Sequence, residues 1–154
     1  MPQLVKGGKY VFGWSKVNNE GKIVIPPEAF EEYQLSSGTK AFLLPGSKSS
    51  GGFVLTTIQL LQDSPLKRTI ENNQKLANYQ TDEGKIVNVN EKPLCWVKIT
   101  EDYFIVPPIS LKEYGVDRNS TLLSVRGSNR GLSFLKKGLI IEEAKKHPEI
   151  KVYE

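Results

Sequence analysis

The chain has 154 residues, of which 38% are hydrophobic and 25% are charged, and its formal net charge is +4. This balance is typical of a folded soluble protein, and no apolar run approaches the roughly 18 residues that a membrane-spanning helix needs. The N-terminus lacks the apolar centre of a signal peptide, and the single cysteine, Cys95, excludes an intrachain disulfide, so we expect a cytoplasmic protein with no membrane partner.

Residues 1–57 form the first of three predicted segments and combine strands with one short helix. Alternating or β-branched apolar runs predict strands at residues 10–17, 22–25, 39–44 and 53–55. The Asn- and Gly-rich stretch 18–21 tolerates positive φ, so we expect a chain reversal between the first two strands. Pro26 lacks a backbone donor and ends the second strand. Pro27 has a φ suited to the first turn of a helix, which we expect to continue to Tyr33.

Residues 58–92 form the second predicted segment, a polar linker. Ser64 is a suitable helix cap and Pro65 a suitable first-turn residue, so a helix is expected from there to about Tyr79. The alternating stretch 85–90 is typical of an exposed strand. We therefore expect the linker to lie on the surface of the protein.

Residues 93–154 form the third predicted segment and repeat the plan of the first. Pro107-Pro108 match Pro26-Pro27 at an offset of 107 − 26 = 81, and the same offset pairs Asn119 with Gly38. That pairing indicates a position with positive φ, which Gly and Asn tolerate best. Further pairs at this offset are Leu111 with Phe30, Tyr114 with Tyr33, and Val116 with Leu35. The segment ends with a predicted helix at residues 139–146 and a predicted edge strand at residues 150–153.

The repeated unit resembles the AbrB/MazE/SpoVT family of DNA-binding domains. The residues that carry this resemblance are the strand, turn and strand of 16–26, the helix to Tyr33, and the strand 41–44. The second copy is degenerate, because no Gly-Lys pair precedes Phe104. Members with one copy dimerise and interleave their hairpins into one barrel, and the two-repeat MraZ relatives have both copies in one chain. The resemblance therefore implies a mainly β fold with short helices: a swapped-hairpin β-barrel formed as an intrachain pseudo-dimer.

The family's usual role implies a transcription regulator that binds duplex DNA. Lys16 and Lys22 occupy the basic positions of the family's first turn, and Lys98 is the repeat mate of Lys16. Arg126 and Arg130 bracket a Gly-Ser-Asn turn and could clasp a phosphate. These five residues are the predicted DNA-binding set; the alternative is that the lysines are ordinary solvated residues of strand edges and the arginines those of an exposed hairpin tip.

Several departures from the family pattern favour a second hypothesis. Tyr103 stands where the repeat mate of Lys22 would be basic, and Glu31 and Glu32 lie on the short helix where phosphates are expected. The alternative is a family member that binds no DNA and acts through protein contacts or a small anionic ligand. A further homo-oligomer stays open under both hypotheses.

An enzyme is the least favoured class. The only histidine, His147, and the only cysteine, Cys95, lie far apart in the sequence, so we expect no catalytic residues, no metal site and no cofactor. The loop 46–52 lacks the spacing of a phosphate-binding loop and is expected to be a flexible hairpin connection. Trp14 and Trp96 are expected to pack in the core or between the two halves.

Overall fold

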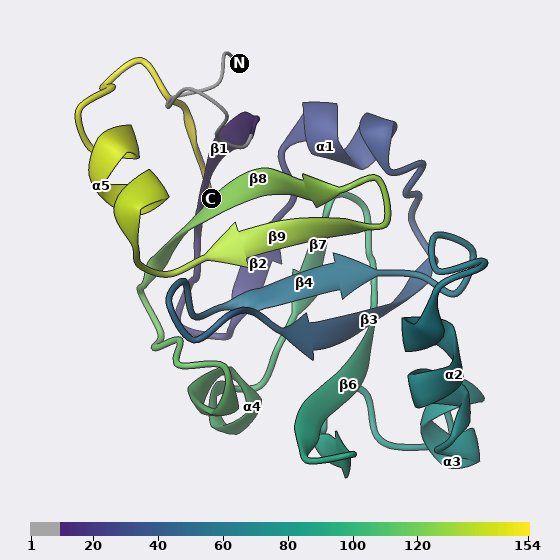
Figure 1. Ribbon diagram of the computed structural model, residues 1–154. Helices are drawn as coiled ribbons and strands as arrows, with labels where there is room; N and C mark the ends of the chain where they lie inside the picture. The colour runs from purple at the N-terminus through teal and green to yellow at the C-terminus, as the bar shows by residue number, and fades with distance from the viewer. Residues whose placement is uncertain (1–9) are drawn as a thin grey trace.

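The computed structural model describes residues 10–154, and part of the first predicted segment, residues 1–9, lies outside the described residues (Figure 1). The strands are β1 (Val11–Lys16), β2 (Lys22–Val24), β3 (Lys40–Pro45), β4 (Phe53–Thr56), β5 (Val87–Val89), β6 (Lys92–Lys98), β7 (Tyr103–Ile105), β8 (Thr121–Ser128), β9 (Gly131–Leu135) and β10 (Val152–Tyr153). The helices are α1 (Pro27–Glu32), α2 (Pro65–Glu71), α3 (Gln74–Ala77), α4 (Pro108–Glu113) and α5 (Leu139–Ala144). The protein is therefore mainly β with short helices, as the sequence predicted. Within the described residues, none of the helices combines the length and the apolar character that crossing a bilayer requires.

The strands form one large open sheet and one small sheet. The large sheet has the order β10-β1-β8-β9-β4-β3-β6-β5, and β2 pairs with β7 in the small one. The predicted closed barrel is therefore wrong, because the large sheet ends at two separate edges, β10 and β5. The strands β2 and β7 do not bridge these edges. Each has three residues, and Pro26 and Pro107, which lack a backbone donor, follow closely.

In both sheets, strands of one repeat pair with strands of the other. β1 pairs with β8 of the other repeat, and β6 pairs in the same way with β3. Equivalent registers recur in the two ladders: Trp14 lies opposite Leu123, and Trp96 lies opposite Phe42. Ile23 lies opposite Phe104, its own mate at the offset of 81. The registers thus define an approximate two-fold relation between the repeats.

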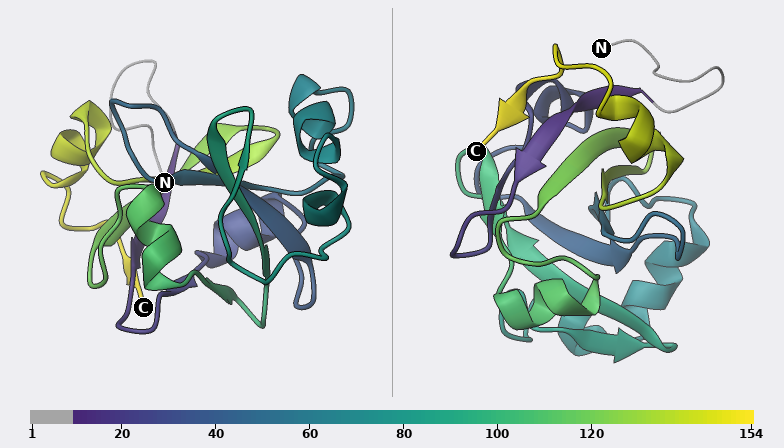
Figure 2. Two further views of the ribbon diagram at one scale, coloured as in Figure 1. Left: turned by 90° about the horizontal axis from the view of Figure 1, so that it is seen from below. Right: turned by 90° about the vertical axis from the view of Figure 1, so that its left-hand side faces the viewer.

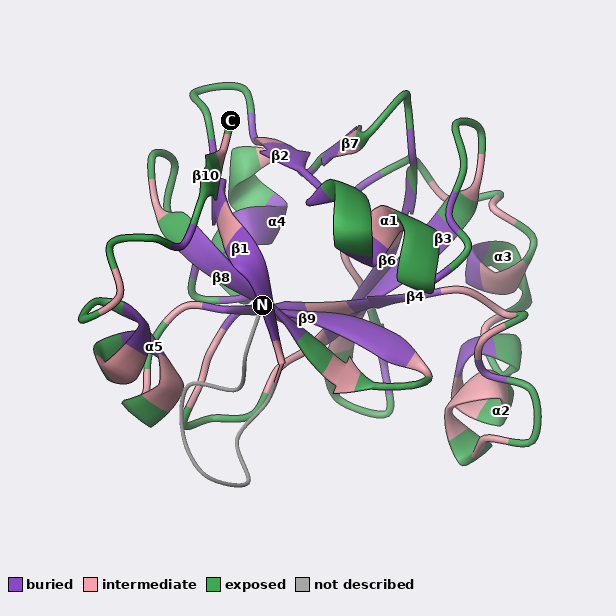
Figure 3. Cartoon of the chain, turned by 90° about the horizontal axis from the view of Figure 1, so that it is seen from above, coloured by how far each residue is buried: buried purple, intermediate pink, exposed green. Residues whose placement is uncertain are grey.

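The main core lies between the large sheet and the β2–β7 pair. Phe53, Phe104 and Phe134 are fully buried there, and their ring centroids are 5.2–6.0 Å apart. Figure 3 shows the strands as largely buried and the connecting turns as exposed. Aromatic burial of this kind dominates the stability of small β proteins.

Two smaller clusters lie on the outer face of the large sheet. One lies under α5 and includes Ile141 and Leu123, and the other lies under α2 and α3 and includes Ile70 and Phe42. Trp14 and Trp96, which were expected in the core or between the halves, are half-buried and each packs against one of these two clusters. Figure 2 shows α5 and the α2–α3 pair at opposite ends of the molecule.

Local details confirm one prediction and correct another. Asn119 has φ = 67° and Gly38 has φ = 96°, as expected for matched left-handed positions. The single helix predicted from residue 64 to about residue 79 is instead two helices. The break falls at Asn73, whose side chain accepts a hydrogen bond from the Leu76 amide at 3.0 Å and so caps a new helix.

Candidate functional site

The turn between β1 and β2 packs beside the loop that precedes β8, and these residues, 16–22 and 117–120, are called the first end. Asn18 shapes the turn, since its side-chain oxygen accepts from the amides of Glu20 and Lys22, both at 2.9 Å. The amide of Val17, in the turn, donates to the carbonyl of Ser120, in the loop, at 2.8 Å. Backbone hydrogen bonds therefore hold the turn and the loop together.

The second end is its counterpart and comprises residues 36–40 and 98–103. The Ile99 amide donates to the Thr39 carbonyl at 2.8 Å, and the Gly38 amide donates to the Ile99 carbonyl at 2.7 Å. Lys40 lies directly opposite Lys98 in the β3–β6 ladder. Figure 3 shows the β1–β2 and β6–β7 turns on either side of the β2–β7 pair. The two ends thus occupy related positions on one side of the molecule.

The first end gathers three cations. Lys16 forms an exposed ion pair with Glu154 at 3.6 Å, and the Lys22 ammonium lies 4.3 Å from the centre of the Tyr103 ring. Arg118 is exposed in the neighbouring loop. Arg118 was not among the predicted DNA-binding residues. Its position beside Asn119, the repeat mate of Gly38, could have placed it at this end from the sequence. The exposed carboxylates at this end are Glu20, Asp117 and Glu154.

The second end is richer in carboxylates than in cations. Lys98 is exposed, and its backbone amide donates to the Glu83 carboxylate at 3.0 Å. Lys40 lies over Tyr79, 4.8 Å from the ring centre. The exposed carboxylates at this end are Glu83, Glu101 and Asp102. The three predicted lysines are therefore divided between two ends of different charge balance.

The two predicted arginines do not share a site. The Arg126 guanidinium donates two hydrogen bonds to the Glu32 carboxylate, and it lies 4.6 Å from the centre of the Tyr10 ring. This hydrogen-bonded pair lowers the pKa of Glu32 and raises that of Arg126. Arg130 instead donates to the Gln62 carbonyl at 3.0 Å. The structure thus joins Arg126 to α1, and Arg130 to the segment that leads into α2.

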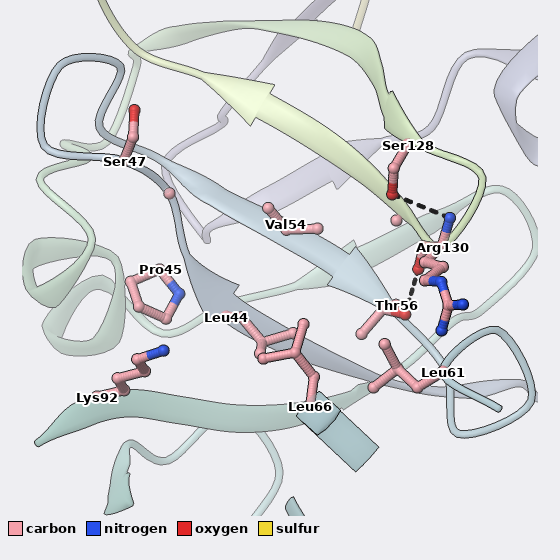
Figure 4. Close-up of a pocket in the computed structure, with 12 residues that line it drawn as sticks. Leu44, Pro45, Ser47, Val54, Thr56, Leu61, Leu66, Lys92, Ser128 and Arg130 are labelled. Carbon is pink, nitrogen blue, oxygen red and sulfur yellow. Dashed lines mark hydrogen bonds between the residues drawn. The ribbon is translucent and has the colours of Figure 1, made fainter. Parts of the chain in front are cut away.

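A pocket of about 350 Å³ lies beside Arg130 on the outer face of the large sheet (Figure 4). Its apolar surface comes from Leu44, Val54 and Leu66, which lie on β3, β4 and α2. Lys92 and Arg130 are the two charged residues among those that line it. The sequence argument did not predict this pocket.

The loop 46–52 uses its backbone amides within the protein. The Gly51 amide donates to the Ser47 carbonyl at 2.8 Å, and the Gly52 amide donates to the Tyr114 carbonyl at 3.0 Å. The Gly46 amide donates to the Gly52 carbonyl at 3.1 Å. Two of these amides bond within the loop and the third bonds to Tyr114, and the loop joins the paired strands β3 and β4, in agreement with the prediction of a hairpin connection.

Cys95 and His147 lie in different environments and do not form a common catalytic or metal site. Cys95 is buried, and burial raises the pKa of its thiol to about 11. His147 lies at the surface between Glu149 and Glu143, at 3.0 and 3.5 Å, and these carboxylates raise its pKa. In residues 10–154 there is no group of three or more His, Cys, Asp or Glu side chains arranged to hold a metal ion.

Comparisons with protein-family models, with curated proteins and with solved structures give no match to this chain. The resemblance to the AbrB/MazE/SpoVT family therefore depends on the residues of the repeat.

Proposed function

We propose that the chain is a DNA-binding transcription regulator of the AbrB type that contacts duplex DNA chiefly through its first end. The observation that carries this proposal is the exchange of strands between the repeats. Because of it, the β1–β2 and β6–β7 turns flank the β2–β7 pair in a two-fold arrangement. An arrangement of this kind supports the swapped-hairpin pseudo-dimer that the resemblance implies, in an open rather than a closed form.

The cations of the first end suit phosphate binding. The Lys16–Glu154 pair is exposed, and exposed pairs contribute about 1 kcal/mol or less, so a phosphate can replace Glu154. The Tyr103 ring orients the Lys22 ammonium. Arg118 adds a guanidinium, which binds phosphate through paired N–H groups. Together the three side chains supply phosphate-binding groups at one end of the molecule.

The second end contributes less to this function. The Lys98 amide bonds to Glu83, and the adjoining turn carries Glu101 and Asp102, so carboxylates outnumber the cations Lys40 and Lys98 here and disfavour a phosphate. Tyr103 also replaces the cation that Lys22 supplies in the first repeat. The proposed contact with DNA is therefore asymmetric.

A salt titration with short duplex DNA tests the proposal, with the Lys16→Gln/Lys22→Gln protein compared with wild type. Each lysine that meets a phosphate steepens the dependence of log K on log salt by about one unit, so the double variant should lose about two units of slope. Lys75→Gln/Lys145→Gln, on α3 and directly after α5, removes the same charge and should leave the slope unchanged. Absence of binding at low salt would reject the proposal, as would equal losses in both variants.

A specific observation favours the second candidate, a module that binds proteins or small anions. Glu32 engages Arg126, and the carboxylates of the second end interrupt the basic surface between the two turns. This candidate predicts no salt-dependent DNA binding at all. The same titration therefore separates the two functions.

A further inference from the structure

Within residues 10–154, no helix covers the middle of the outer face of the large sheet. α5 covers one end of this face and α2 with α3 covers the other, and β4 with the adjoining part of β3 lies between them (Figure 1). Val54 and Leu66 are only half-buried there, while Leu44 and Leu61 are buried beneath. The result is a trough with an apolar floor.

The two ends of this trough are positively charged. In Figure 4, Lys92 lies at the end beside Pro45, and Arg130 lies at the opposite end beside Thr56. The lining contains no Asp or Glu. A ligand that matches this surface needs an apolar middle and negative charge at its ends.

Arg130 is held in a defined position. Its backbone carbonyl accepts a hydrogen bond from the Thr56 hydroxyl at 2.6 Å, and its amide donates to the Ser128 hydroxyl oxygen at 3.0 Å. One guanidinium nitrogen donates to the Gln62 carbonyl at 3.0 Å. A guanidinium has further N–H donors, and these suit a carboxylate in a paired geometry.

We infer that this trough binds an elongated aliphatic dicarboxylate, with one carboxylate at Arg130, the other at Lys92, and the chain over Val54. The volume of about 350 Å³ lies within the range of small-molecule sites, which begins at about 300 Å³. Two separated cations match two carboxylates, whereas a monocarboxylate leaves one cation unused. This site is independent of the proposed DNA contact, because it lies on the outer face of the sheet, away from the β2–β7 side.

The test is a titration of the isotope-labelled full chain with suberate, followed by NMR, with octanoate as the monocarboxylate of equal length. Suberate should shift the amides of Gly46, Ser47 and Gly131 in a saturable way, and it should bind about tenfold more tightly than octanoate. Arg130→Gln should weaken suberate binding roughly tenfold. Lys92→Gln should reduce suberate to the affinity of octanoate.

Lys75→Gln is the matched control, because Lys75 is exposed on α3 and does not line the trough, so its affinity for suberate should equal that of wild type. Lys92 is exposed, so its substitution leaves the fold intact and the comparison stays valid. Equal affinities of wild type for suberate and octanoate would overturn the inference, as would shifts that do not saturate. None of these outcomes depends on DNA, so failure of the DNA titration leaves this test unaffected.

Discussion

Single residues are constrained most where the two repeats touch. Gly21 has φ = 85°, and a Cβ atom there would lie 2.0 Å from the Val106 carbonyl oxygen. The Val106 amide in turn donates to the Gly21 carbonyl at 3.0 Å. Glycine at this position therefore permits both the turn and the close approach of the second repeat.

Gly21→Ala should lower the free energy of unfolding by about 3 kcal/mol, because it combines positive φ with a backbone clash. Gly115→Ala is the matched control, since Gly115 has φ = 73° but nothing within 4 Å of its added Cβ, and it should cost roughly 1 kcal/mol. Urea denaturation measures both values. Equal losses would show that the clash with Val106 is relieved without cost.

Among the secondary-structure elements, α1 contacts the β8–β9 hairpin of the other repeat through hydrogen bonds and an ion pair. The Tyr33 hydroxyl lies 2.6 Å from the Ser128 carbonyl oxygen and 2.8 Å from that of Gly131. Glu32 adds the ion pair with Arg126. Burial raises the pKa of Tyr33 to about 12 from its ordinary value of 10.0. This helix thus contributes to the contact between the repeats as well as to its own half.

Tyr33→Phe should lower the free energy of unfolding by about 1–2 kcal/mol, because hairpin carbonyls lose a donor. The folded pKa lies above the ordinary one, so the stabilisation is fully present below about pH 10 and is lost as pH rises towards 12. The difference between wild type and variant should therefore shrink over that interval. Tyr103→Phe, which keeps the ring under Lys22, serves as control. If the stability difference between wild type and Tyr33→Phe did not change with pH, the raised pKa of Tyr33 would be contradicted.

At the scale of the whole molecule, neither repeat supplies a sheet of its own. In the large sheet β1 depends on β8, β6 depends on β3, and β4 pairs with β9. The main core likewise takes Phe53 from one repeat and Phe104 from the other. Folding therefore requires both repeats at once, because two or three strands alone bury too little apolar surface.

Fragments 1–82 and 83–154 should each lack cooperative unfolding when isolated, and their mixture should regain it. Each fragment contains only one strand of every pair that joins the two repeats, so neither fragment can form those pairs alone. Circular dichroism during urea denaturation, with the intact chain as reference, measures this. A fragment that unfolds cooperatively as a monomer would contradict it. Sedimentation of the intact chain measures whether it forms a further homo-oligomer, which both hypotheses leave open.

Much of the local structure could be predicted from the sequence. The turn at Gly21, the strand ends near Pro26 and Pro107, and the matched positions Gly38 and Asn119 follow from backbone preferences that single residues impose. The split at Asn73 was missed, since the same Asn side chain is compatible with a helix interior and with a new cap. Such preferences act over a few residues and are therefore visible in the sequence.

The remaining features depend on contacts between residues far apart in the sequence. The sheet stays open because β2 and β7 pair with each other, and no local pattern specifies that choice. The pairing of Arg126 with Glu32 joins residues 94 apart in the chain, and the trough between Lys92 and Arg130 combines five separate segments. The repeated elements can be predicted from the sequence, because the turn, cap and periodicity signals that define them are local. Charge pairing and cavities depend on side chains that only folding brings together.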